Sequence, residues 1–452
     1  MASPSSSKRK FSTDRPISPP PLRRKVQSTT TQNAVASFFT PTSQKAPEKI
    51  TWQERGADDD SPRTLLVGKY VPSDGSSTHD AEEKKRRKVA AFDFDSTLIL
   101  TASGKKFSSD PQDWKWWHPS VPGTLRKLYR EDGYRVVVIS NQGGISLKPD
   151  PKAPKAHQNK LSTFKTKVAA VFNQLDLPVS IYAATEKDIF RKPRTGMWKE
   201  LLEDYDIDPA DLDLEHSIFV GDAGGRSAGG GKPKDFSCSD RDFAENIGIK
   251  FHTPEEFFLQ EAPRPFTRSF DPAAYVTDVA SEGSQVYEKR NDQDIVLFCG
   301  SPGAGKSTFY RKYLEPLGYE RVNQDTLKTR DKCIKVAGEY LDEGKSVVID
   351  NTNADTEVRS KWVELAVKRS IPIRCVLFTA PPEICKHNDA VRALNDLMNP
   401  EKRSLLPSVA FTGFTSRYQR PALSEGFQDI TEVAFKFEGS AAEQQIWTRY
   451  WT

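Results

Sequence analysis

Residues 89–98, VAAFDFDSTL, place two acidic side chains directly after a short run of small and apolar ones. The run Val89–Phe92 is typical of a strand that is buried on both faces of a parallel sheet. Asp93 and Asp95 follow at positions i and i+2, whose side chains point to the same side of an extended segment. Ligands bind at the C-terminal ends of strands in open parallel sheets. The stretch therefore predicts an α/β fold in which two carboxylates face one crevice.

A second stretch, residues 295–308 (IVLFCGSPGAGKST), has a similar layout and different chemistry. A predicted buried strand, Ile295–Cys299, leads into a Gly-x4-Gly-Lys-Ser loop, and a helix is expected over Ser307–Leu314. Backbone N–H groups of such a loop surround phosphates, its lysine reaches the transferred phosphate and its serine binds Mg²⁺. The alternative, a glycine-rich turn with a chance lysine, is disfavoured by the flanking elements. The predicted nucleotide-binding residues are Gly300, Gly303, Ala304, Gly305, Lys306, Ser307 and Thr308.

Strand and helix patterns alternate around both stretches, which predicts two doubly wound parallel-sheet domains. The further expected strands are Arg135–Ile139, Ser180–Ala184, Ser217–Val220, Glu320–Asn323, Ser346–Asp350 and Ile373–Phe378, and the expected helices include Gly123–Arg130 and Trp198–Glu203. A polar, proline-containing stretch separates the two units. We expect a disordered basic tail over 1–50, a first domain over 51–262, a linker over 263–292 and a second domain over 293–452.

Composition narrows the class of protein. The 452 residues are 36% hydrophobic and 28% charged, with a net charge of +4, which is a balance typical of globular domains. No apolar run is long enough to span a bilayer, and the N-terminus lacks the apolar core of a secretory signal. The five cysteines are scattered without paired-ligand spacing, which favours core packing in a reducing compartment. We expect a monomer without membrane attachment.

The first site gains further polar residues at predicted strand ends. Ser140 and Asn141 can hydrogen-bond phosphate oxygens, Lys192 can neutralise a pentacovalent intermediate, and Asp222 can complete a metal site, with Asp235 and Asp240 supporting it through water. Each motif alone is more often a turn or a cap, but the ordered set favours chemistry. One carboxylate of the Asp93/Asp95 pair would attack phosphorus while the other moves protons. Attack by one anion on another requires charge compensation, most simply by Mg²⁺.

This set of motifs resembles the four motifs of the haloacid dehalogenase (HAD) superfamily of phosphatases. The match consists of Asp93-x-Asp95-x-Thr97, Ser140, Lys192 and Gly221-Asp222. The resemblance implies that Asp93 is the nucleophile and Asp95 the general acid/base. It also implies a Mg²⁺ site formed by Asp93, Asp222 and the backbone carbonyl of Asp95. Ser96 departs from the pattern, since the superfamily usually has glycine there, and the local loop must therefore accommodate a Cβ atom.

The acceptor side of the second site is less specific in sequence. Asp325 ends a predicted strand and could accept the proton of an attacking hydroxyl, or it could cap the helix that follows. Asp350, in Asp350–Asn353, could be a Walker B-like carboxylate or part of a turn. Arg392 lies where small kinases have a mobile lid and could stabilise the transferring phosphoryl group, or it could be a solvated arginine on a helix.

The order of HAD-type unit, linker and P-loop unit resembles the eukaryotic polynucleotide kinase/3′-phosphatase family of DNA repair enzymes, from about residue 52 to the C-terminus. The most specific matching stretches are Phe94–Leu98, Arg191–Trp198, Val220–Arg226, Asp235–Arg241, Gly303–Thr308 and Asp350–Asn353. The resemblance implies removal of 3′-phosphates from DNA ends and transfer of the ATP γ-phosphate to 5′-hydroxyls. It assigns Asp325 as the base and Arg392 to the lid. Vertebrate members have a forkhead-associated module, for which too few ordered residues precede Asp93.

The sequence contains two kinds of candidate targeting signal. Basic clusters at 8–10, 23–25 and 84–88 are typical of nuclear import signals, so we expect a nuclear protein; a solvated basic tail is the alternative. Residues 32–39, QNAVASFF, resemble the PCNA-interacting box. In that motif Gln32 anchors the backbone while Val35, Phe38 and Phe39 enter a pocket. A chance apolar patch is the alternative, but adjacent phenylalanines are unusual in such a polar stretch.

Three rival functions remain at this stage. A bifunctional kinase and phosphatase of small metabolites would not need the basic tail or the PCNA-like box. A scaffold with decayed sites would not keep the complete sets of catalytic residues. An enzyme that heals RNA ends is compatible with every motif. The leading prediction is a DNA-end repair enzyme that uses Mg²⁺ and ATP.

Overall fold

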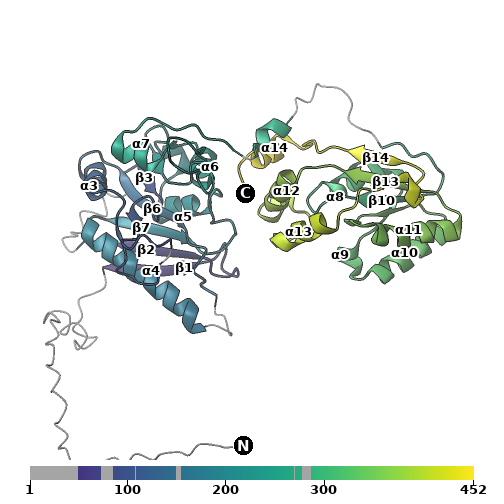
Figure 1. The fold of residues 1–452 in the computed structure, drawn as a ribbon, viewed down its shortest axis with the longest axis horizontal. Helices are drawn as coiled ribbons and strands as arrows, with labels where there is room; N and C mark the ends of the chain where they lie inside the picture. The colour runs from purple at the N-terminus through teal and green to yellow at the C-terminus, as the bar shows by residue number, and fades with distance from the viewer. Residues whose placement is uncertain (1–48, 73–84, 107, 149–153, 269, 277–286) are drawn as a thin grey trace, which may run out of the picture. The chain divides into compact units, whose positions relative to one another are not determined.

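The computed structural model describes residues 49–72, 85–106, 108–148, 154–268, 270–276 and 287–452. These residues form two α/β domains, and each has its own β-sheet with helices packed on both faces (Figure 1). The predicted fold class is therefore confirmed. A small hairpin of β4 (Ile99–Leu100) and β5 (Lys115–Trp116) follows the first acidic motif.

The first sheet has seven strands in the order β1-β2-β7-β6-β3-β8-β9. Five of them are parallel, and β3 lies at their centre, paired with β6 on one side and β8 on the other. This central position explains why all four residues of β3 are buried. The strand bounds are β3 Val89–Phe92, β6 Arg135–Asn141, β7 Val179–Ala184, β8 Ile218–Val220 and β9 Lys250–His252.

Alternate side chains of these strands enter two separate cores. On one face the sheet packs against α3 (Val121–Arg130), α4 (Pro154–Leu175) and α7 (Pro254–Leu259). On the other face it packs against α5 (Gly196–Asp204) and α6 (Ser239–Ile247). Burial on both faces is what the continuous apolar runs in the sequence predicted.

Two antiparallel strands that the sequence patterns did not indicate extend this sheet. β1 (Ile50–Arg55) pairs with β2 (Leu65–Tyr70), and β2 in turn pairs antiparallel with β7. Residues of β2 are mostly buried, whereas in β1 only Ile50 is buried and the other residues are half-buried or exposed. β1 is therefore the edge strand of the sheet.

The second sheet has five parallel strands in the order β11-β12-β10-β13-β14. One face packs against α10 (Arg330–Asp342) and α11 (Thr356–Arg369), and the other against the helix after the P-loop, α12 (Pro382–Ala393) and α13 (Ser408–Arg417). The remaining elements near the site are β10 Ile295–Cys299, β11 Glu320–Val322, α9 Gln324–Leu327, β12 Val347–Ile349, β13 Ile373–Phe378, β14 Ile430–Val433 and α14 Ala441–Trp447.

The helix expected over Ser307–Leu314 differs from its prediction in form. An α-helix, α8, covers only Lys306–Phe309, and the chain continues as a π-helical turn over Tyr310–Leu314. The wider turn buries Tyr310 and Leu314 in the core beside β10. The residue pattern does not encode this change of backbone form.

The stretch expected as a linker packs along part of its length. Phe266 forms a β-bridge with Arg226, and Arg268 makes an ion pair of 2.8 Å with Asp242 of the first domain. A short 3₁₀ turn, Pro272–Tyr275, follows. Among the described residues, no helix is long and apolar enough to cross a membrane. All five cysteines have free thiols, and four of them are buried.

Candidate active sites

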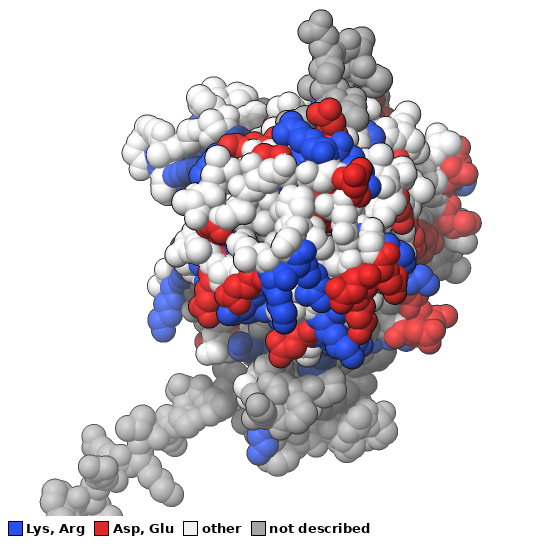
Figure 2. Space-filling model, turned by 90° about the vertical axis from the view of Figure 1, so that its right-hand side faces the viewer, with Lys and Arg blue, Asp and Glu red and all other residues white. Residues whose placement is uncertain are grey.

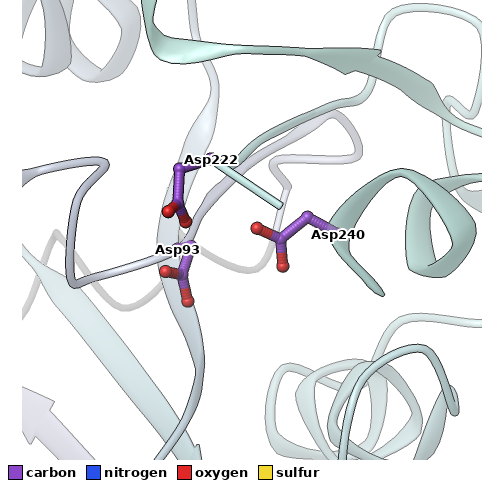
Figure 3. A group of neighbouring side chains, drawn as sticks. All are labelled: Asp93, Asp222 and Asp240. Atoms are coloured by element: carbon purple, nitrogen blue, oxygen red, sulfur yellow. The ribbon is translucent and has the colours of Figure 1, made fainter. Parts of the chain in front are cut away.

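Adjacent parallel strands bring the first group of carboxylates together. Asp93 follows β3 and Asp222 follows its neighbour β8, and the Asp93 N–H donates to the carbonyl of Val220 over 2.9 Å. Asp240, in the first turn of α6, points into the same space (Figure 3). Carboxylate oxygens of the three aspartates all lie within 4.8 Å of one another. The sequence predicted that Asp93 and Asp222 would meet, and it placed Asp240 farther out than the structure does.

Lys192 neutralises part of this acidic cluster. Its Nζ atom lies 2.7 Å from Asp93 Oδ1 and 2.8 Å from Asp240 Oδ1, and it also donates to the carbonyl of Ile139 over 2.7 Å. The lysine side chain is 1% exposed, so all three ammonium protons are used inside the protein. Lys192 is therefore fixed against the predicted nucleophile, as a residue that stabilises charge on phosphorus must be.

One lysine does not balance three carboxylates, of which two are buried and Asp222 is half-buried. Burial, together with repulsion from Asp93, raises the pKa of Asp222 well above its ordinary value. Burial also raises the pKa of Asp240, although its ion pair with Lys192 opposes this shift. A hard divalent cation would relieve the remaining repulsion, and carboxylate oxygens are the ligands that Mg²⁺ prefers. The residues present therefore fit Mg²⁺, with Asp93 and Asp222 as the side chains that would bind it.

Gly221 allows Asp240 to approach this closely. A Cβ atom at position 221 would lie 2.3 Å from Asp240 Oδ2, which is far inside van der Waals contact. The same Oδ2 atom accepts a hydrogen bond of 3.0 Å from the N–H of Ala223. The Gly-Asp pair of the sequence motif thus serves two carboxylates, because Gly221 makes room for one and Asp222 supplies the other.

Asp95 follows Asp93 by two residues, and its side chain is exposed to solvent. Although solvent reaches this side chain, desolvation by the surrounding protein and the charge of Asp93 raise its pKa, while a hydrogen bond from Gln142 opposes the rise. Gln142 Nε2 donates to Asp95 Oδ2 over 2.7 Å and to Ser140 Oγ over 3.0 Å. A carboxyl group with a raised pKa can hold the proton that a leaving oxygen requires.

Two predicted supporting residues have different partners from those expected. The Asn141 side chain donates to the carbonyl of Lys192 over 3.1 Å and accepts from its N–H over 2.9 Å, so it holds the lysine loop in place. Asp235 accepts from Arg226 Nε at 2.7 Å and from two backbone N–H groups of the loop after β8. It therefore organises that loop, and it is not part of the acidic cluster.

Ser96 occupies the position that is usually glycine, and its backbone is left-handed with a φ of 61°. Non-glycine residues rarely adopt this conformation. The loop thus accommodates a Cβ atom, as expected, and the serine side chain is exposed. Hydrogen bonds between the loop and residue 99 hold the turn, with the Ser96 N–H donating to the carbonyl of Ile99 over 2.9 Å.

The P-loop forms the second site at the end of β10. Gly303 has a φ of 74°, and a Cβ atom there would lie 2.1 Å from the carbonyl oxygen of Cys385, so this position requires glycine. Lys306 is buried and donates to the carbonyls of Gly300 and Ser301 over 2.9 and 2.7 Å. Burial lowers the pKa of this lysine. Its ammonium group is positioned to exchange these carbonyls for phosphate oxygens.

Asp350 and Ser307 form the second candidate metal pair. The Ser307 hydroxyl donates to Asp350 Oδ2 over 2.8 Å, and the carboxylate is only 2% exposed. The structure therefore favours the Walker B-like interpretation of Asp350 over a turn. A hydroxyl and a carboxylate beside a phosphate-binding loop are ligands suited to Mg²⁺. These two residues would hold the ion next to a bound nucleotide.

Asp325 does not cap α9, although capping a helix was the alternative role for this residue. The cap of α9 is Asn323, whose Oδ1 accepts from the N–H groups of Asp325 and Thr326. The Asp325 side chain is 73% exposed, and one of its oxygens lies 3.2 Å from Nη1 of Arg403. A carboxylate in this position can accept a proton from a hydroxyl that enters the cavity.

Arg392 lies on α12 and faces the same cavity. Its Nη2 atom lies 2.5 Å from Asp389, whereas its Nε atom is buried and has no hydrogen-bond partner among the described residues. The side chain as a whole is 25% exposed, so its guanidinium group can contact an anion in the cavity. The cavity has a volume of about 1430 Å³, and its lining includes Gly305, Lys306, Asp325, Asp350 and Arg392. The structure thus brings the predicted kinase residues together.

Several residues of the sites were not predicted from the sequence. Gln142 contacts Asp95, Asn388 donates to the P-loop carbonyl of Gly303 over 2.8 Å, and Arg321 contacts Asp350. None of them lies in a recognisable motif. The one signal that could have suggested a role is position, because these residues lie near a strand end or on a neighbouring helix. The PCNA-like motif, Gln32 to Phe39, lies outside the described residues.

Comparison with known proteins matches both domains. The model of the polynucleotide kinase 3 phosphatase family matches residues 88–258, and the model of an AAA domain family matches residues 295–421. A bifunctional polynucleotide phosphatase/kinase of Schizosaccharomyces pombe is 42% identical over 92% of this chain and 97% of its own length. A polynucleotide 3′-phosphatase of Saccharomyces cerevisiae is 30% identical over 38% of this chain and 87% of its own. A polynucleotide 3′-phosphatase of Arabidopsis thaliana is 31% identical over 40% of this chain and 25% of its own.

Proposed function

The chain belongs to the family of bifunctional polynucleotide phosphatase/kinases, and we propose on this basis that it repairs DNA ends. It removes the phosphate from a 3′ end and adds a phosphate to a 5′-hydroxyl, which leaves the two groups that strand joining requires. The observation that carries the proposal is the presence of two complete sites on one chain. One is the acidic cluster with its buried lysine, and the other is the P-loop that shares a cavity with an exposed carboxylate.

The residues of the first site divide the phosphatase reaction between them. The Asp93 carboxylate attacks phosphorus, the bond to the 3′-oxygen breaks, and Asp95 gives that oxygen its proton. Asp95 then takes a proton from water, which attacks phosphorus and releases inorganic phosphate from Asp93. Lys192 holds Asp93 in line and balances charge throughout. Bound Mg²⁺ would supply further charge neutralisation beside Asp93 and Asp222.

The second site performs transfer from ATP. Asp325 accepts the proton of the 5′-hydroxyl, whose oxygen bonds to the γ-phosphorus while the bond to the β-γ bridging oxygen breaks. Lys306 and the loop N–H groups bind the phosphates, and the guanidinium group of Arg392, which lines the same cavity, donates to the phosphoryl group. Ser307 and Asp350 would hold Mg²⁺, which lowers the charge repulsion between nucleotide and acceptor.

A polymer end is a better substrate for the first site than a small metabolite. Phe236, in the loop between Asp235 and Asp240, is 99% exposed, and exposed aromatic rings stack on the bases of single strands. The exposed ring therefore favours recognition of a single-stranded end at the first site. On the face shown in Figure 2, which is the right-hand side of Figure 1, basic and acidic side chains are interspersed.

The basic clusters and the PCNA-like motif would direct the enzyme to its place of action. We infer a nuclear location from the three basic clusters and PCNA binding from Gln32, Val35, Phe38 and Phe39, in a protein that acts as a monomer. The double substitution Phe38→Ala/Phe39→Ala should abolish binding of a peptide of residues 25–48 to PCNA in calorimetry, because it removes the apolar anchors. Both enzymatic activities should stay unchanged. If the wild-type and the doubly substituted peptide bind PCNA equally, the motif is a chance apolar patch.

One oligonucleotide tests both activities. It has a 3′-phosphate and a 5′-hydroxyl, and it is incubated with Mg²⁺ in the presence and absence of ATP. Asp93→Ala should abolish only loss of the 3′-phosphate, and Lys306→Ala should abolish only gain of the 5′-phosphate. A folded single variant that loses both activities would contradict two independent sites. A ribo-oligonucleotide of the same sequence, processed faster than the DNA, would favour RNA-end healing instead.

A further inference from the structure

An arginine side chain lies between the two predicted Mg²⁺ ligands of the kinase site. Arg321, on β11, donates from Nε to Asp350 Oδ2 over 2.8 Å, and its Nη2 atom lies 2.6 Å from the same oxygen. Nη2 also donates to Ser307 Oγ over 2.9 Å. The guanidinium group therefore contacts both the hydroxyl and the carboxylate that would bind the ion.

The position of Arg321 is determined by further contacts. Its third nitrogen, Nη1, donates to Glu401 Oε1 over 3.0 Å, and its guanidinium lies 5.7 Å from the ring centroid of Tyr310. The side chain is 20% exposed, and Asp350 is 2% exposed. A buried carboxylate without a cation would be strongly destabilising. Arg321 thus supplies the positive charge that Asp350 needs in the absence of metal.

Glu401 belongs to the loop that follows α12, and it binds three arginines. Besides Arg321 it contacts Arg311, and its Oε2 atom lies 2.6 Å from Arg403. Arg403 is also the partner of Asp325, at 3.2 Å. A continuous chain of charged contacts therefore runs from Asp350 to Asp325, that is, from the metal side of the cavity to the acceptor side.

We propose that Arg321 is a placeholder cation that occupies the Mg²⁺ position of the kinase site until metal and nucleotide arrive together. This inference rests on the proposed kinase function. Mg²⁺ and the guanidinium group cannot both contact Asp350 Oδ2 and Ser307 Oγ, because the two oxygens are only 2.8 Å apart. Binding of the ion therefore requires Arg321 to leave. Glu401, already in contact with Nη1, is the carboxylate that receives it.

Competition between the two cations has a measurable consequence. An Mg²⁺ ion that binds must displace the charged hydrogen bonds of Arg321. The arginine therefore raises the Mg²⁺ concentration at which the site is half-saturated. Nucleotide phosphates add ligands and charge, which favours Mg²⁺ over the arginine only when both components are present. Arg321 is thus a positioning residue that couples metal binding to nucleotide binding.

The test measures binding rather than turnover. ADP binding to the full-length protein is followed by calorimetry at a series of free Mg²⁺ concentrations, which isolates the kinase site from the metal site of the phosphatase domain. Arg321→Ala should lower the half-saturating Mg²⁺ concentration by about tenfold, which corresponds to about 1.4 kcal/mol. Arg321→Lys, which keeps a cation, should lower it less. Hydrogen exchange of the β10 and β12 amides at the wild-type rate shows that the kinase domain of each variant is folded.

A matched variant separates this role from a general effect of the loop. Arg311 shares Glu401 with Arg321, and among the described residues it makes no hydrogen bond or ion pair with Ser307 or Asp350. Arg311→Ala should therefore leave the half-saturating Mg²⁺ concentration unchanged. The proposal is wrong if Arg321→Ala leaves the value unchanged or raises it, if it abolishes ADP binding, or if Arg311→Ala shifts the value equally. Failure of the wild-type protein to bind ADP at any Mg²⁺ concentration would instead refute the kinase function.

Discussion

Replacing Lys192 by methionine should destabilise the phosphatase domain severely. The change keeps the length of the side chain and removes its charge, which leaves Asp93 and Asp240 without their shared partner. The lysine is 1% exposed and Asp240 is 3% exposed, so solvent cannot replace the lost contacts. Removing one member of a buried ion pair costs about 3–5 kcal/mol. The 3′-phosphatase rate should fall by about 10²- to 10³-fold or more, since charge on phosphorus also loses its stabiliser.

Hydrogen exchange measured by mass spectrometry can locate this loss. In metal-free buffer at neutral pH, amides of β3 and β6 should exchange about 10²- to 10³-fold faster in Lys192→Met, because each 1.4 kcal/mol of opening free energy is a factor of ten. Amides of β10 and β12 in the other domain should be unaffected. Added Mg²⁺ should recover part of the protection, since it neutralises the same carboxylates.

Lys187→Met is the matched control. Lys187 lies in the same loop after β7 but is exposed, so the identical chemical change should alter stability by no more than about 0.5 kcal/mol. If the amides of β3 and β6 are as well protected from exchange in Lys192→Met as in Lys187→Met, the reasoning is refuted. The buried ion pairs would then contribute little, and the acidic cluster would be held together by other means.

Three further predictions address other features of the two sites. Asn388→Ala leaves the carbonyl of Gly303 without its side-chain donor, so calorimetry should show ADP binding weakened by about 1 kcal/mol or more with the 3′-phosphatase rate unchanged. Ser96→Gly relieves a left-handed serine, so chemical denaturation should show the phosphatase domain stabilised by up to about 1 kcal/mol; a loss of stability would contradict this. Because the pKa values of Asp222 and Asp240 are raised, the metal-free protein loses stability as the pH rises through these values. Mg²⁺ should therefore raise the melting temperature more at about pH 8 than at about pH 5. An equal rise at the two pH values would argue against these ligands.

Residues that act at strand ends were predictable from the sequence. A short apolar run in the sequence indicates a buried parallel strand. The polar residues that follow such strands lie at the same edge of the sheet. Asp93, Asp222 and the P-loop were placed in this way, without knowledge of which strands are neighbours. Asp240 was placed farther from the others than it is, because its approach depends on the absence of a side chain at Gly221.

Partners that come from distant parts of the chain were not predictable. Arg321 lies on β11, and it reaches Asp350 only because β11 and β12 are neighbours in parallel register. Gln142 follows a strand end, but nothing in its type distinguishes it from other polar loop residues. The sequence suggested Asp325 as a possible helix cap, whereas Asn323 caps α9 in the structure. Such details depend on tertiary geometry, which residue patterns do not encode.

The hairpin of β1 and β2 has a consequence for how the phosphatase domain can be divided from the rest. Every residue of β7 is buried, and β2 satisfies the backbone groups on its outer side. A fragment that begins at Lys88, where the family match begins, would lack both hairpin strands and present β7 as an open apolar edge. Unpaired edges of this kind recruit strands from other molecules. Such a fragment would self-associate although its active-site residues are complete, whereas one that begins at Lys49 would keep its amphipathic edge strand and stay soluble.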